Sequence, residues 1–147
     1  MYNETPAGGP GHAAALNILA RARPERLKQF AETLLDTMVD VSVLANRTGL
    51  VMVPMRDTVE NVDFHLGEVL VSEAHIADGA GHVGYGMVTG RDLERAMAVA
   101  VVDLHMAARG EEPATIHFLM EEQAQLAAAD ALRMRQVEAT RVEMETF

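Results

Sequence analysis

Histidines are the residues of this sequence most suited to binding a metal ion, and there are six of them. None lies at the HExxH spacing of a zinc-binding helix or at another recognised ligand spacing. If Ala77 paired with His82 across a turn, His75 would become the diagonal neighbour of His82 on one sheet face. With Glu73 as a third ligand, this group would suit zinc or iron. We favour the alternative, in which both histidines are exposed polar residues near the end of a hairpin.

Two glycines and an arginine form a second group with chemical potential. Gly84 and Gly86 lie on one face of a predicted strand, so another part of the structure can approach closely there. A packed helix is the commoner cause, and a bound ligand is the alternative. The spacing matches neither a P-loop nor the glycine motif of a dinucleotide-binding turn. Arg91 precedes a predicted helix and suits contact with an anion, an ion pair with a neighbouring carboxylate, or contact with a partner.

The carboxylates do not form a catalytic pair. Asp92 and Asp103 lie on one predicted helix, about 16 Å apart by the standard helical rise. Asp103 has apolar neighbours, so we expect it to pair with a buried donor or to lie on a polar flank. The sequence has no Cys, which excludes disulfides, thiolate metal sites, iron–sulfur clusters and a cysteine nucleophile. Spacing and composition by themselves therefore identify no active site.

Charge and hydropathy restrict the partners. The net charge of −10 opposes binding to DNA or RNA, and it opposes the binding of a polyanionic nucleotide by this chain alone. No apolar run reaches the length of a membrane span. The first residues lack the basic and apolar regions of a signal peptide. We therefore expect a cytoplasmic protein, which the absence of Cys also fits.

These residues must be positioned by a central unit, Phe64 to Asp103, in which two predicted strands are followed by a helix. The strands are joined by a tight turn at Asp78–Gly81, because Asp-Gly sequences favour such turns. Gly90, Arg91 and Asp92 form the next corner, with Gly90 and Asp92 in structural roles. The carboxylate of Asp92 is a candidate N-cap for the helix that follows. That helix is apolar around much of its girth, so it must pack against more than one neighbour.

The remaining segments predict an α+β fold. We expect a flexible tail at residues 1–11 and one domain at 12–147, beginning with a helical hairpin divided at Pro24. An antiparallel sheet of about four strands follows, and then two long C-terminal helical segments. The first two strands are predicted at Val39, Val41 and Val43 and at Leu50–Val53, separated by a turn at Asn46–Gly49. Pro54 marks a sheet edge or a strand end, and Arg56–Asp63 forms a loop or exposed hairpin. The last helix is predicted to bury Ile116, Leu119, Met120, Ala124, Ala127 and Ala131.

The sequence resembles the PhnG family, a subunit of the bacterial carbon–phosphorus lyase system, from about Leu16 to Phe147. No single motif is strong, and the order and spacing of the matching residues carry the resemblance. They are Leu19-Ala20, Pro24-Glu25, Thr48-Gly49-Leu50-Val51, Phe64, Leu66-Gly67-Glu68, Asp78-Gly79, Gly84-Tyr85, Gly90-Arg91-Asp92, Ala96, Ala100, Asp103, Val137, Ala139-Thr140-Arg141-Val142-Glu143 and Thr146. The chain departs from the family at Arg56–Asn61, where relatives have a Gly-rich turn, and at Met97, where they often have Glu.

The resemblance implies a role in phosphonate catabolism. Subunits of this family act with PhnH, PhnI and PhnL to displace adenine from MgATP with an alkylphosphonate, which gives a ribose 1-alkylphosphonate 5-triphosphate. PhnG lies in a core complex with PhnH, PhnI and PhnJ, and the nucleosidase-like chemistry is attributed to PhnI. We therefore expect a subunit that is not catalytic by itself and binds no cofactor alone, since MgATP is a substrate of the complex.

Two interpretations of the candidate residues remain open. In the first, Arg91, Arg141, Gly84 and Gly86 contact a partner subunit or an anion, and apolar helical surface is buried against other chains. In the second, the chain is a free-standing regulatory domain that binds a small anion on the Gly84 and Gly86 face with Arg91.

Overall fold

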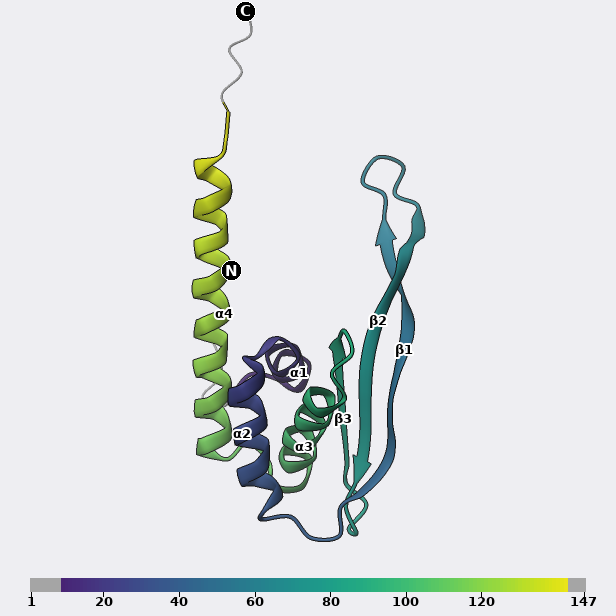
Figure 1. The fold of residues 1–147 in the computed structure, drawn as a ribbon, viewed down its shortest axis with the longest axis vertical. Helices are drawn as coiled ribbons and strands as arrows, with labels where there is room; N and C mark the ends of the chain where they lie inside the picture. The colour runs from purple at the N-terminus through teal and green to yellow at the C-terminus, as the bar shows by residue number, and fades with distance from the viewer. Residues whose placement is uncertain (1–8, 143–147) are drawn as a thin grey trace, which may run out of the picture.

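Four helices lie on one side of a three-stranded antiparallel sheet in the computed structural model, which describes residues 9–142 (Figure 1). The predicted α+β class is confirmed. The predicted tail at residues 1–11 falls largely outside the described residues. Of its described part, Gly9 donates its backbone N–H to Glu111 Oε2 at 2.8 Å.

The chain begins with the predicted helical hairpin, α1 (His12–Arg21) and α2 (Pro24–Leu35). Pro24 occupies the first turn of α2, where its missing N–H has no helical acceptor to satisfy. The residues that α2 buries, Leu27, Ala31 and Leu34, follow helical spacing. The rings of Phe30 and Phe118 stack at a centroid distance of 4.4 Å and join α2 to the last helix.

The sheet has the strand order β1 (Ser42–Arg56), β2 (Asp63–Ala77) and β3 (Val83–Thr89). The prediction of about four strands differs from this because the expected turn at Asn46–Gly49 is part of β1. Each of its four residues pairs in continuous register with β2, and Arg47 Nε donates to Glu73 Oε1 at 2.6 Å across the pair. Asn and Gly favour turns only as a local preference, which pairing with a neighbouring strand can override.

The segment Leu50–Val53 is not the predicted central strand, because β1 lies at the edge of the sheet. Leu50 is 63% exposed and Met52 is 58% exposed. The interpretation of Pro54 as an edge residue is confirmed, as is the exposed hairpin around Arg56–Asp63. Apolar side chains on both faces therefore reflect a lack of cover within the described residues rather than a position in the middle of the sheet.

Helix α3 (Leu93–Arg109) is the centre of the fold. It packs on β3 and β2 with one side and on α1 and α2 with another, as Figure 1 shows. Its buried residues surround the helix, which confirms that it has several neighbours. They are Ala96, Ala98, Val99, Ala100, Val101, Val102, Asp103, Leu104 and His105.

Helix α4 (Pro113–Ala139) packs against α1, has its buried residues in its first half, and extends with its C-terminal part beyond the rest of the fold (Figure 1). The predicted burial is correct for Leu119 but wrong for Met120, Ala124, Ala127 and Ala131, which are exposed. Helical periodicity identifies which residues share a face, but it does not supply the neighbour that buries them. None of the helices within residues 9–142 is long and apolar enough to cross a membrane.

Candidate interaction surface

The face of β3 that carries Gly84 and Gly86 is covered by α3. A Cβ atom at Gly84 would lie 2.3 Å from the backbone oxygen of Ala100, and one at Gly86 would lie 2.2 Å from that of Ala96. Only glycine allows the helix backbone to approach this closely. The packed-helix interpretation is therefore confirmed.

The corner before α3 is held by a buried serine that sequence reasoning missed. Ser72 Oγ donates to the carbonyl oxygen of Gly90 at 2.8 Å and accepts the backbone N–H of Asp92 at 2.9 Å. Gly90 has a φ of +90°, which favours glycine, and Asp92 Oδ1 accepts the backbone N–H of Arg95. Gly90 and Asp92 therefore have the structural roles expected of them. A serine at an alternating strand position gave no signal, because most such residues face solvent.

Both candidate arginines are exposed, and each lies just outside a different helix. Arg91 sits at the corner before α3 and forms no ion pair with any residue of 9–142. The neighbouring carboxylates are held instead by Lys28, whose Nζ lies 3.8 Å from Asp92 and 3.3 Å from Glu94. Arg141 follows α4 and pairs with Glu138 at 3.1 Å. Arg91 and Arg141 are therefore placed by two different helices, one at the start of α3 and the other at the end of α4.

The histidines are not arranged as the conditional metal site requires. Ala77 pairs with Val83 rather than with His82, so the register differs by one residue. His82 lies in the turn, where its Nδ1 is 2.7 Å from Asp78 Oδ2. His75 instead meets the ring of Tyr85 edge-on. Within residues 9–142, no three His, Asp or Glu side chains gather as a metal site.

The sheet face opposite α3 carries a small polar network. Tyr85 Oη donates to Glu73 Oε2 at 2.7 Å, and Arg47 donates to the other carboxylate oxygen. These two hydrogen bonds hold the pKa of Glu73 below its ordinary value. Burial and the bond to Glu73 raise the pKa of Tyr85 to about 12. Near neutral pH, Tyr85 is therefore a neutral phenol and Glu73 is ionised and paired with Arg47. Groups with these protonation states suit a structural role better than proton transfer near neutral pH.

Two buried carboxylates join the helices to one another. Asp103 accepts the backbone N–H of Tyr85 at 2.9 Å, and its other oxygen lies 2.7 Å from His12 Nε2. The expected pairing of Asp103 with a donor is confirmed. Glu122, which sequence reasoning missed, accepts the backbone N–H of Arg23 and bonds to its guanidinium at 2.7 Å.

Apolar side chains are exposed along two elements that extend beyond the rest of the fold, the outer part of the β1–β2 hairpin and the second half of α4 (Figure 1). An isolated two-stranded hairpin is at best marginally stable in water, and exposed apolar patches mark interaction sites. The exposed residues of the hairpin are Leu50, Val51, Met52, Met55, Val59, Val62, Phe64 and Leu66. Those of the α4 half are Leu132, Met134 and Val137.

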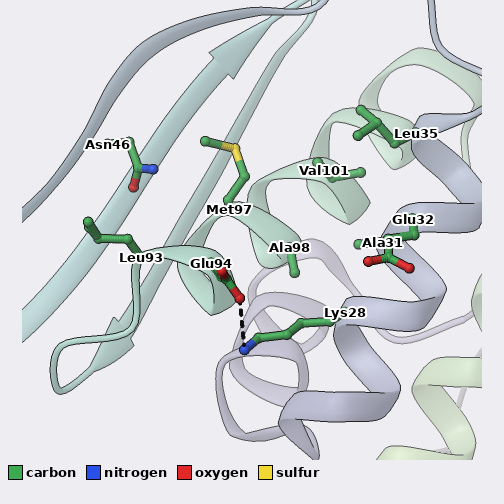
Figure 2. Close-up of a pocket in the computed structure, with 10 residues that line it drawn as sticks. All are labelled: Lys28, Ala31, Glu32, Leu35, Asn46, Leu93, Glu94, Met97, Ala98 and Val101. Carbon is green, nitrogen blue, oxygen red and sulfur yellow. Dashed lines mark ion pairs between the residues drawn. The ribbon is translucent and has the colours of Figure 1, made fainter.

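A groove of about 370 Å³ separates β1 from α2, with α3 as its floor (Figure 2). Figure 2 shows Asn46 of β1 on one side and Leu35 of α2 on the other. Met97 of α3 extends toward β1 between them. The Lys28–Glu94 ion pair lies at one end of the groove. Its lining is mainly apolar, which suits a hydrophobic segment better than a small charged ligand.

Comparison with known proteins identifies what the chain is similar to. The sequence model of the family described as "Phosphonate metabolism protein PhnG" matches residues 12–147. The chain is also similar to the alpha-D-ribose 1-methylphosphonate 5-triphosphate synthase subunit PhnG of Rhizobium meliloti (strain 1021). The two are 31% identical over 142 residues, which cover 96% of this chain and 90% of the relative. The family match begins with the first residue of α1 and extends over all the elements described above.

Proposed function

The chain belongs to the PhnG family of phosphonate metabolism proteins, and on this premise we propose that it is a subunit of an alpha-D-ribose 1-methylphosphonate 5-triphosphate synthase. The resemblance predicted from the sequence is confirmed at the level of the family. The role of a synthase subunit comes from the name of the Rhizobium relative, and the surface of this chain supports it.

The exposed apolar surface is the observation that carries the proposal. Val59 at the tip of the hairpin is 88% exposed, and Met134 on the second half of α4 is 67% exposed. Both elements lack a neighbour within residues 9–142 that could bury these side chains. A subunit that assembles with other chains would bury them at its interfaces, which are richer in apolar residues when the association is permanent.

In this proposal, the partners are PhnI-like, PhnH-like and PhnJ-like subunits, with a PhnL-like subunit bound transiently. The complex displaces adenine from MgATP with an alkylphosphonate in the cytoplasm. The chain supports this reaction without catalysing it, as one domain that spans residues 12–147. The Glu73–Tyr85 pair and the buried Asp103 already have structural partners, which supports a structural role for these carboxylates.

Co-expression tests the role of the chain as a dependent subunit. Expressed alone, it is expected to be poorly soluble or self-associated, because water contacts the apolar residues of the hairpin and α4. Co-expression with the PhnI-like subunit should give a soluble complex, which size-exclusion chromatography with light scattering measures. Co-expression with an unrelated soluble protein is the control. A monodisperse monomer of the chain alone would contradict the proposal.

Arg91 is proposed to contact a partner or an anion within the assembled complex, with Arg141 as a second candidate. Arg91→Ala should weaken assembly or synthase activity about tenfold, as loss of one charged contact does. Arg141→Ala serves as a comparison, because Arg141 already pairs with Glu138. Titration calorimetry of the isolated chain with ATP or methylphosphonate tests the alternative of a free-standing anion-binding domain. Measurable affinity that Arg91→Ala abolishes would favour that alternative. The structure counts against it, because α3 covers the Gly84 and Gly86 face on which the anion would bind.

A further inference from the structure

The outer edge of β1 offers backbone hydrogen-bonding groups to another strand. Leu70 accepts the backbone N–H of Gly90 at 2.8 Å, so the backbone groups of Leu70 point toward the β3 side of β2. Leu50 lies opposite Leu70 in the β1–β2 register. In an antiparallel pair, residues alternate between bonding their neighbour and pointing away from it. The N–H and C=O of Leu50 therefore point away from β2, toward the free edge.

The same alternation applies along the regular part of β1. Asn46, Thr48 and Met52 share the outward orientation of Leu50, whereas Arg47, Gly49 and Val51 bond to β2. A free edge of this length is normally shielded by charges, proline or a covering element. Here Pro54 protects only the outer end, and no further strand of the described structure covers the rest.

The groove in Figure 2 meets this edge at Asn46. Its wall at Asn46 belongs to β1, and its apolar floor and far wall belong to α3 and α2. A strand added beside β1 would direct alternate side chains toward this groove. A helix in the groove could bury apolar surface, but it would leave the outward N–H and C=O groups of β1 without partners. The groove and the edge together therefore favour an extended segment.

The charges beside the groove indicate one feature of that segment. Lys28 is held by Glu94 and Asp92. Glu32, on the α2 wall, forms no ion pair with a residue of 9–142 and belongs to a chain of net charge −10. A basic side chain on the incoming segment would complement it.

We propose that the edge of β1 from Asn46 to Met52 binds an extended segment of another synthase subunit as a fourth strand. An apolar side chain of that segment occupies the groove between α2 and α3, and a basic side chain lies beside Glu32. The inference rests on the proposed function, since it takes the occupant from the same complex.

Hydrogen exchange of single amides tests the added strand. The chain is isotope-labelled, co-expressed with the PhnI-, PhnH- and PhnJ-like subunits, exchanged within the complex, and then recovered for NMR. The amides of Asn46, Thr48, Leu50 and Met52 are expected to exchange at least about 100-fold more slowly in the complex than in the free chain. The amides of Arg47, Gly49 and Val51, which already bond to β2, serve as internal controls.

Two substitutions test the edge and the groove separately. Leu50→Pro removes one outward N–H without removing a bond to β2, and it should lower the yield of complex at least about tenfold. Leu35→Lys places a charge in the groove at an exposed position and should lower the yield of complex by a similar factor. It tests the inference independently, also where Leu50→Pro fails to fold. Val39→Lys, an exposed aliphatic residue outside this groove, is the matched control and should leave the yield unchanged.

The outcomes separate this inference from the proposed function. A complex that forms while the four outward amides still exchange rapidly would overturn the added strand and leave the subunit role intact. Failure of the chain to bind any of the three subunits would overturn both. In the isolated chain, the four amides could also become more protected from exchange as the protein concentration rises. This result would show that a second copy of the chain occupies the edge, and it would also overturn the inference.

Discussion

Gly86→Ala is expected to lower the free energy of unfolding by about 3 kcal/mol or more, at the upper end of the cost of overpacking a core. The new Cβ would lie 2.2 Å from the backbone oxygen of Ala96 and 2.7 Å from the backbone nitrogen of Ala100. Both obstacles are helix backbone, so no side chain can rotate away. Helix α3 would have to move from β3, and α3 is the element on which the sheet, α1 and α2 all pack.

Gly49→Ala is the matched control for this prediction. It makes the same chemical change on the same sheet, but no atom beyond Gly49 itself and its two chain neighbours lies within 4 Å of the added Cβ. Its expected effect is within about 0.5 kcal/mol, as for most surface substitutions. Urea unfolding of the two variants and the original chain, in whichever assembly state is soluble, measures the difference. Equal midpoints for the two variants would show that α3 does not approach β3 as closely as described.

Glu122→Gln is expected to lower the free energy of unfolding at neutral pH by about 2 to 3 kcal/mol. Glu122 is 1% exposed and accepts bonds from the backbone N–H and the guanidinium of Arg23. The amide keeps the shape of the side chain but removes its charge and one acceptor oxygen. The guanidinium of Arg23 is partly exposed, so water can solvate it in the variant, which keeps the loss below that of a fully buried pair.

The same carboxylate predicts the direction of the pH dependence. Burial opposes the ionisation of Glu122, but the hydrogen bonds and the charge of Arg23 outweigh it and hold the pKa of Glu122 below its ordinary value of 4.5. A folded-state pKa below the unfolded one stabilises the protein fully above about pH 4.5, and the stabilisation is lost as pH falls through the folded pKa. Glu122→Gln should therefore lose less stability on acidification than the original chain.

Glu121→Gln is the control for this pair of measurements. Glu121 immediately precedes Glu122 on α4 and pairs with Arg26 at 2.6 Å, but both side chains of this pair are partly exposed. Surface pairs of this kind contribute less than about 1 kcal/mol. Thermal unfolding at neutral pH and at pH 4 compares the two variants. If both lose equal stability at neutral pH, the Glu122–Arg23 pair does not join α4 to the helical hairpin in the way we describe.

Local sequence patterns predicted much of the architecture. The break at Pro24, the turn at Asp78–Gly81, and the N-cap at Asp92 all follow from the conformations that these residues prefer. The apolar pattern of α3 also predicted a helix with several neighbours, because a residue's burial on a helix follows its angular position. The break, the turn and the N-cap each depend on interactions within a few residues of the chain.

Predictions that needed a distant neighbour were less reliable. Asn46–Gly49 has the composition of a turn but is held in β1 by pairing with β2. The buried Ser72 and Glu122 gave no usable signal, because their partners lie on elements far away in the sequence. The sequence offered several candidate site residues, and the structure covers Gly84 and Gly86, leaves Arg91 exposed before α3, and places Arg141 after the end of α4.

The sequence by itself determined the class of the fold, the order of most of its elements, the helix around which it is built, and, through the order and spacing of scattered residues, the family. The tertiary structure alone decided which apolar faces are covered. Leu50–Val53 and the stripe through Ala124, Ala127 and Ala131 have the pattern of buried segments, yet no neighbour within residues 9–142 buries them. Periodicity records that a face is to be buried, whereas contact between distant elements decides whether this chain or another one buries it.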